Sequence, residues 1–199
     1  SMNNSYTNSI CGVGLPNKRS SNGKEVKGID ITIGVFFDGT GNNKYNIEYN
    51  KSAKYADKKG VYNEKTRKKE GGYDSYNQGF TNVVNLWDMY KADGKIYIEG
   101  PGTANSSDKW TSSGKKDSAF WGPALGTGDY GVEKKLKRAD KLIIEEVSTI
   151  LTKYKKNEAR SITFDVFGFS RGATANRYFV RKVLFNPDFN INSFLQKVL

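Results

Sequence analysis

Residues 161–182, SITFDVFGFSRGATANRYFVRK, decide the fold that we predict for this chain. Ile162–Phe167 is β-branched and aromatic apart from one aspartate, which is typical of a strand buried on both faces of a parallel sheet. From Arg171 to Leu184 the apolar residues recur at helical spacing. At the junction, residues 168–172 read GFSRG, so a serine stands in the turn between a strand and a helix.

This strand–serine–helix arrangement is typical of a nucleophile elbow. Gly168 and Gly172 remove the Cβ atoms that would collide with the neighbouring strand and helix, while the helix directs its positive end toward a developing oxyanion. We therefore predict that Ser170 is a catalytic nucleophile and that the backbone N–H of Arg171 is one oxyanion donor. The alternative is a chance G-x-S-x-G in a loop, and the strand before it and the helix after it argue against that alternative.

Composition limits the domain count and the partners. A chain of 199 residues with 36% hydrophobic content can bury one core, so a single domain is expected. The formal charge of +11 would attract nucleic acid or anionic lipid, and it also fits a Lys-rich solvated surface. Because no helix-turn-helix, zinc-finger or aromatic RNA-binding signature is present, we predict no nucleic-acid partner. Cys11 is the only cysteine, which excludes an intrachain disulfide.

The rest of the chain continues the alternation of strands and helices. Residues 1–28 are rich in Asn, Ser, Gly and Lys, and we interpret them as a flexible N-terminal arm with one apolar patch at Ile10–Leu15. Residues 44–75 have little periodicity and predict a long surface excursion. The periodic segments predict strands at Ile29–Phe37 and Lys95–Glu99, and helices at Thr81–Lys91 and about Val132–Lys155.

This order of elements predicts an α/β fold with a parallel sheet, right-handed crossovers and helices on both faces, over residues 29–199. Ligands of such sheets bind beyond the carboxyl ends of the strands. The glycine-rich loops at Asp38, Gly100 and Ser170 all leave such ends, so we expect them to converge on one edge of the sheet.

The loop after the first central strand, DGTGNN at 38–43, has two interpretations. If that strand lies beside the elbow strand, Gly39 or Thr40 would supply the second oxyanion amide and Asp38 would organise the loop. Alternatively, Asp38 and the two asparagines would bind a hard cation such as Ca²⁺ or Mg²⁺ through oxygen atoms. We favour the organising role and predict no metal.

Five motifs occur in the same order as in one hydrolase family. They are FFDGTGNN at 36–43, TNVVNLW at 81–87, GPGT at 100–103, GTGDYG at 126–131 and VFGFSRGATANR at 166–177. On these motifs residues 29–185 resemble the catalytic α/β-hydrolase core of the type VI secretion phospholipase effectors of the first lipase-effector family. The pair FDGT-x-N and GFSRGA is far more specific than either motif alone.

The resemblance implies a Ser-Asp-His triad that hydrolyses glycerophospholipid or other lipid acyl esters without a cofactor, in a secreted antibacterial effector. It implies a bacterial protein whose partners are lipid, the membrane surface, and an immunity or secretion-apparatus protein. No apolar run approaches the roughly twenty residues of a membrane span, and no signal-peptide core is present, so export would use a leaderless route.

The chain departs from this pattern because it contains no histidine. In α/β-hydrolases the acid and the histidine base follow the serine, and of the triad Ser170 alone can be carried over. We therefore expect that residues 29–199 are the N-terminal portion of a catalytic domain, completed by its C-terminal remainder or by a second chain. A lysine-assisted serine mechanism is conceivable, although no lysine is singled out by spacing. The competing interpretation is a truncated or degenerate hydrolase fold that serves as a non-catalytic partner- or membrane-binding module.

Two further patterns suggest chemistry that we do not predict. Gly126-x-Gly128-x-x-Gly131 matches the dinucleotide fingerprint, but no strand precedes it. Asp38-Gly39-Thr40 resembles a phosphatase signature whose nucleophilic aspartate would fall at Phe36.

Overall fold

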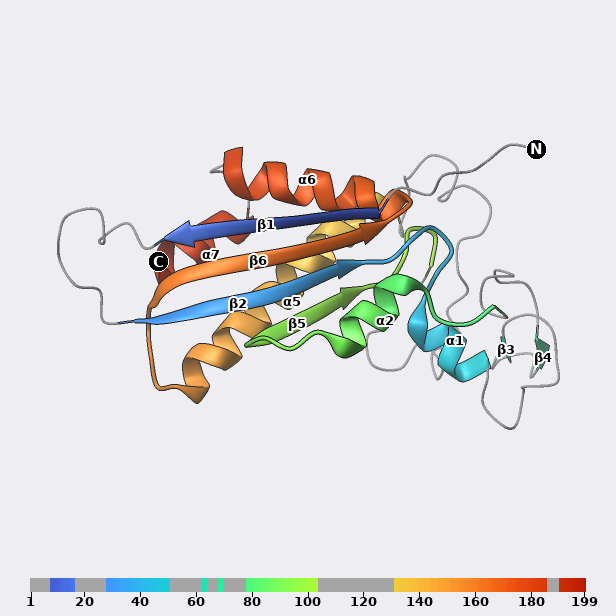
Figure 1. Cartoon of the computed structure of the whole chain (residues 1–199), viewed down its shortest axis with the longest axis horizontal. Helices are drawn as coiled ribbons and strands as arrows, with labels where there is room; N and C mark the ends of the chain where they lie inside the picture. Colours follow the sequence, from blue (N-terminus) through green and yellow to red (C-terminus); the bar gives the residue numbers. More distant parts are fainter. Residues whose placement is uncertain are drawn as a thin grey trace.

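The structure is a computed structural model that describes residues 8–16, 28–50, 62–63, 68–69, 78–103, 131–185 and 190–199 (Figure 1). It has an α/β architecture built on a four-stranded mixed sheet, with helices on both faces. The predicted α/β class is confirmed at this level. Within the described residues, no helix combines the length and apolar character needed to cross a membrane.

The sheet has the order β1-β6-β2-β5. Its strands are β1 (Asn8–Pro16), β2 (Ile29–Phe37), β5 (Gly94–Ile98) and β6 (Ala159–Phe169). β2 pairs in parallel with both β6 and β5, which confirms the predicted strand positions and places β2 beside the elbow strand. The register sets Phe37 opposite Gly168, so the loop after β2 begins beside the elbow.

β1 corrects two expectations. It lies in the stretch interpreted as a flexible arm, where the apolar patch forms an edge strand antiparallel to β6 with Val13 opposite Phe164. The physical reason is that β6 has a second edge whose backbone N–H and C=O groups need partners, and an apolar segment can supply them. The sheet is therefore mixed rather than wholly parallel.

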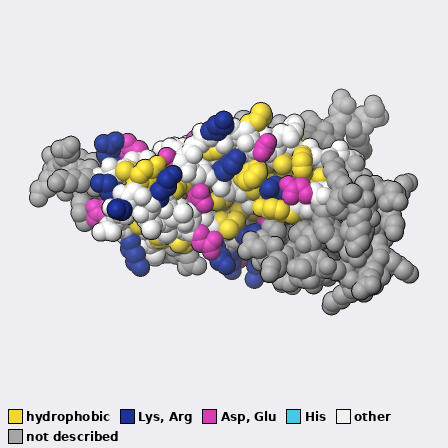
Figure 2. Space-filling model, turned by 90° about the horizontal axis from the view of Figure 1, so that it is seen from below, with side chains coloured by type: hydrophobic (Ala, Val, Ile, Leu, Met, Phe, Trp, Pro, Cys, Tyr) yellow, Lys and Arg dark blue, Asp and Glu magenta, His cyan; other side chains and the backbone are white. Residues whose placement is uncertain are grey.

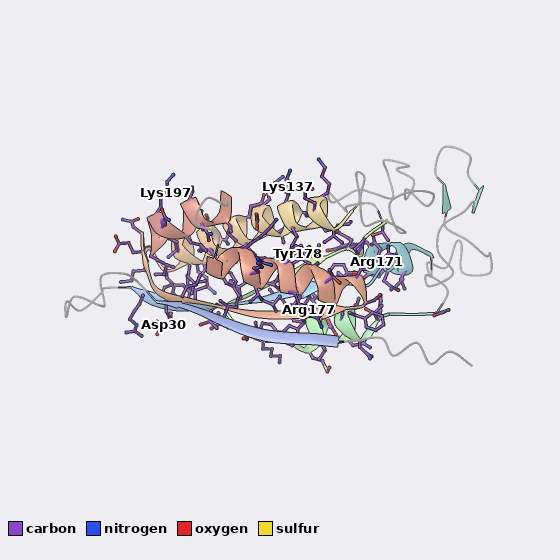
Figure 3. All side chains as sticks on the ribbon, turned by 90° about the horizontal axis from the view of Figure 1, so that it is seen from above. Asp30, Lys137, Arg171, Arg177, Tyr178 and Lys197 are labelled. Carbon is purple, nitrogen blue, oxygen red and sulfur yellow. The ribbon has the colours of Figure 1, made fainter. Side chains whose placement is uncertain are left out.

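Helices cover the two faces unequally (Figures 1 and 3). On one face lie the long helix, the helix after the elbow and the C-terminal helix, which are α5 (Val132–Lys153), α6 (Arg171–Phe185) and α7 (Asn190–Val198). α2 (Asn82–Met89) lies on the opposite face. α7 was not among the predicted elements. The expected surface excursion contains α1 (Lys44–Asn50) and a short ladder of β3 (Tyr62–Asn63) with β4 (Lys68–Lys69).

The core follows the alternation of the central strand. Ile31, Ile33 and Phe37 of β2 are buried in the cluster that includes α5, α6 and α7 side chains, whereas Phe36 packs with α2 and Tyr97 on the opposite face. Each face of β2 thus has its own apolar cover, which explains why its second half, residues 33–37, is buried at every position. The carboxyl ends of β2, β5 and β6 point to one edge, as the parallel pairing requires.

Candidate functional site

The elbow is the most distinctive feature of that edge. β6 ends at Phe169, α6 begins at Arg171, and Ser170 between them has φ 54°. A non-glycine residue in this left-handed region costs about 1–2 kcal/mol, so the surrounding structure must hold it there. The Ser170 carbonyl accepts a hydrogen bond from the Ala173 N–H at 2.9 Å, which closes the turn.

Both glycines of the motif are required by close backbone contacts. A Cβ on Gly168 would lie 2.3 Å from the Gly172 carbonyl oxygen. A Cβ on Gly172 would lie 2.3 Å from the carbonyl oxygen of Phe37 and 2.5 Å from that of Asp38. The first turn of α6 therefore rests on the end of β2, and the steric role predicted for the two glycines agrees with the packing.

The loop after β2 is held against the elbow. A Cβ on Gly39 would lie 2.7 Å from the Phe169 ring, so the loop passes next to the residue that precedes Ser170. The Asp38 N–H donates to the Ile98 carbonyl at 3.0 Å, and the Asn42 N–H donates to the Gly39 carbonyl at 3.0 Å. The loop after β2, the end of β5 and the elbow thus meet beside Ser170.

Asp38 organises this junction. Its carboxylate is fully buried and accepts from the Gly39 N–H at 2.8 Å, the Thr81 hydroxyl at 2.9 Å and the Tyr97 hydroxyl at 2.5 Å. Burial raises the pKa of Asp38 to about 6, against the opposing effect of these hydrogen bonds. Thr81 also caps α2 by accepting from the Val84 N–H, so one carboxylate joins β2, α2 and β5. These three bonds fit the loop-organising interpretation of Asp38.

The two candidates for the second oxyanion donor differ in this geometry. The Gly39 N–H already donates to Asp38, and that bond draws it away from a substrate. Among the described residues, the Thr40 N–H donates no hydrogen bond, and the Thr40 hydroxyl is buried without a partner. The arrangement therefore favours Thr40 over Gly39 for this role.

Arg171 contributes a backbone amide and an unusual side chain. It lies at the end of α6 nearest α1, whereas Arg177 and Tyr178 lie farther along the helix (Figure 3). As the first helical residue, Arg171 has an N–H without an intrahelical partner. The Arg171 Nη1 atom is buried without a hydrogen-bond partner, and no ion pair joins Arg171 to Asp38 within the described residues.

A buried ionic cluster beside the GPGT loop was missed at the level of sequence. Glu99 is buried and forms a two-pronged bond with Arg138, at 2.8 and 2.9 Å. Lys135 is also buried, and its Nζ donates to the Thr103 carbonyl at 2.7 Å. The available signal was the position of Lys135, four residues before Ala139 on the apolar stripe of α5.

The candidate site lacks a recognisable base in the described part of the chain. Ser170 Oγ makes no hydrogen bond there, and the full sequence contains no histidine. The described ranges also hold no cluster of three or more His, Cys, Asp or Glu side chains suited to a metal ion. Residues 126–130 of the dinucleotide-like motif lie outside the described residues.

Comparisons with family models, with curated proteins and with solved structures gave no match for this chain.

Proposed function

We propose that this chain carries the nucleophile and oxyanion-binding portion of a serine ester hydrolase with an α/β-hydrolase-like core. The observation that carries the proposal is the positive φ of Ser170, in a turn whose close packing requires Gly168 and Gly172. A strained serine between a strand and a helix persists only where packing over-determines it, and such strain concentrates at functional sites.

The chemistry follows from the positions of these groups. Ser170 Oγ attacks the acyl carbonyl carbon, the C=O electrons move to oxygen, and the amides of Arg171 and Thr40 stabilise the resulting oxyanion. Collapse of this intermediate breaks the ester C–O bond and releases the alcohol, and water then hydrolyses the acyl-serine. A base must accept the Oγ proton and return it to the leaving alcohol.

We propose that this base is contributed by polypeptide outside these 199 residues, either further sequence of the same protein or a second chain. The support is that the chain has no histidine and that the described residues leave Ser170 Oγ without a partner. For the substrate, we propose a glycerophospholipid acyl ester at a membrane surface. We propose further that the protein is bacterial and acts as a secreted antibacterial effector. Both steps rest on the resemblance of the FDGT and GFSRGA motifs.

The test is covalent labelling with a fluorophosphonate probe, with and without added imidazole as a substitute base. We expect slow labelling of the chain, faster labelling with imidazole, attachment at Ser170 by peptide mass spectrometry, and none in Ser170→Ala. Labelling that is equal in parent and Ser170→Ala would contradict the proposal.

The second candidate is a non-catalytic module that binds a partner or an anionic membrane. The absence of histidine and the formal charge of +11 favour it. One face, however, carries cations, carboxylates and hydrophobic side chains intermixed rather than a field of one sign (Figure 2). Co-sedimentation with vesicles containing phosphatidylglycerol, together with no labelling of Ser170 under any condition, would support this candidate over the hydrolase.

A further inference from the structure

We propose that Lys135 and Thr103 are positioning residues that hold the loop after β2, residues 39–42, against the elbow. This inference rests on the proposed function for its catalytic meaning, but its structural content is independent of it. Neither residue was among the predicted site residues, and both are buried. Their effect would pass through the GPGT loop at 100–103.

The first step joins α5 to the GPGT loop. Lys135 is 1% exposed and its Nζ donates to the Thr103 carbonyl at 2.7 Å. A buried ammonium is costly unless it is paired, and the nearby Glu99 carboxylate supplies the opposite charge. Burial alone would raise the pKa of Glu99, but the charges of Lys135 and Arg138 hold that pKa below its ordinary value. One directed bond of Lys135 thus goes to a loop carbonyl, beside the carboxylate of Glu99.

The second step is a set of bonds around Thr103, which is fully buried. Its hydroxyl donates to the Gly100 carbonyl at 2.8 Å and accepts from Asn43 Nδ2 at 3.2 Å. Its own N–H also donates to the Gly100 carbonyl, at 3.1 Å. Thr103 therefore holds the turn of the GPGT loop and the side chain of Asn43, at the end of the loop after β2.

The third step joins the two loops through their backbones. The Gly100 N–H donates to the Asn42 carbonyl at 2.8 Å, and the Gly41 N–H donates to the Pro101 carbonyl at 3.0 Å. A Cβ on Gly100 would lie only 1.8 Å from the Gly39 carbonyl oxygen, so the loops touch without space for a side chain. Movement of the GPGT loop would consequently move the Thr40 amide.

The cluster of Glu99, Lys135 and Arg138 does more than stabilise the fold, because Lys135 donates a hydrogen bond to a loop carbonyl, that of Thr103. The Glu99 charge already has a two-pronged partner in Arg138, so stability alone does not require a second buried cation. Loss of Lys135 leaves Glu99 paired but releases the carbonyl of Thr103. The expected consequence is local loosening of both loops rather than global unfolding.

The experiment compares Lys135→Met with Lys137→Met, a matched control on the same helix. Lys137 points away from the sheet (Figure 3), is 57% exposed and pairs only with the exposed Glu133 among the described residues. Amide hydrogen exchange of Gly41 and Gly100 is the primary readout, with Val166 of β6 as the reference amide. Removal of a hydrogen bond from a charged donor predicts exchange about tenfold to a hundredfold faster in Lys135→Met, and no change at Val166. Lys137→Met should leave all three amides unchanged.

Thr103→Val is the second variant, since valine keeps the shape but not the hydroxyl, and Thr103→Ser should restore parental exchange. Unchanged exchange of Gly41 and Gly100 in both Lys135→Met and Thr103→Val would overturn the inference, as would acceleration that includes Val166 equally. The labelling rate of Ser170 with imidazole is the secondary readout, and we expect Lys135→Met to lower it about tenfold or more. If the parent does not label at all, the proposed function fails, while the exchange of the two loops still decides the positioning role.

Discussion

Replacement of Ser170 by glycine should stabilise the fold even though it removes the proposed nucleophile. Ser170 has φ 54°, and a non-glycine residue there costs about 1–2 kcal/mol. Glycine avoids this cost but adds about 0.5–1 kcal/mol of unfolded-state entropy. Ser170→Ala keeps the strained conformation and, because Ser170 Oγ has no hydrogen bond among the described residues, loses no bond. We expect Ser170→Gly to exceed Ser170→Ala by about 1 kcal/mol in the free energy of unfolding.

The assay is thermal unfolding followed by circular dichroism, in which about 1 kcal/mol corresponds to roughly 2–4 °C for a chain of this size. Lys155 provides an internal calibration, since it follows α5 with φ 53° and is exposed to solvent. Lys155→Gly should therefore gain a similar amount at a position without a proposed function. If Lys155→Gly raises the melting temperature while Ser170→Gly lies below Ser170→Ala, the strain argument at the elbow is refuted.

Two further predictions concern the contacts around the elbow. Gly172→Ala places a Cβ 2.3 Å from the Phe37 carbonyl oxygen, so it should lower the free energy of unfolding by about 1–3 kcal/mol and slow Ser170 labelling. The control is Gly14→Ala, whose Cβ would have its nearest contact at 3.9 Å, and it should change neither quantity in the same denaturation and labelling assays. The pKa of Asp38 is raised to about 6, so the folded state binds its proton more tightly than the unfolded state, and this stabilising contribution is present below about pH 4 and lost as the pH rises through 6. Asp38→Asn should remove up to about 3 kcal/mol of that pH dependence between pH 4 and 7, measured by urea unfolding, and an unchanged slope would contradict the burial argument.

The elements that the sequence predicted well are those whose pattern is locally complete. β2 and β6 each contain a run of apolar residues, α5 and α6 carry apolar residues at helical spacing, and the positions of all four agree with the structure. The elbow could also be predicted, because a serine between two glycines at a strand–helix junction permits few backbone conformations. Local pattern does not predict β1, because its short apolar segment is a strand only through its pairing with the free edge of β6.

Long-range polar contacts could not be predicted for a different reason. Lys135 and Glu99 are 36 positions apart, and nothing in either segment alone states that two charges will be buried together. Likewise, whether Gly39 or Thr40 is the better candidate for the second oxyanion donor depends on the orientation of the Asp38 carboxylate, which accepts the Gly39 N–H. Such features depend on tertiary geometry, and the sequence offered only the anomaly of a lysine on an apolar stripe.

The arrangement also separates two requirements of a serine hydrolase. The conformation of Ser170 and the two candidate oxyanion amides are fixed by backbone contacts between β2, β5, β6 and α6, which involve no base. Preorganised amides stabilise an oxyanion without reorganisation at the moment of reaction, whereas proton transfer needs a group within hydrogen-bond reach of Oγ. It follows that an external base should raise the rate of Ser170 labelling without changing the fold. Acceleration by imidazole by the same factor in the parent and in the slower-labelling Gly172→Ala would assign the two requirements to separate parts of the molecule.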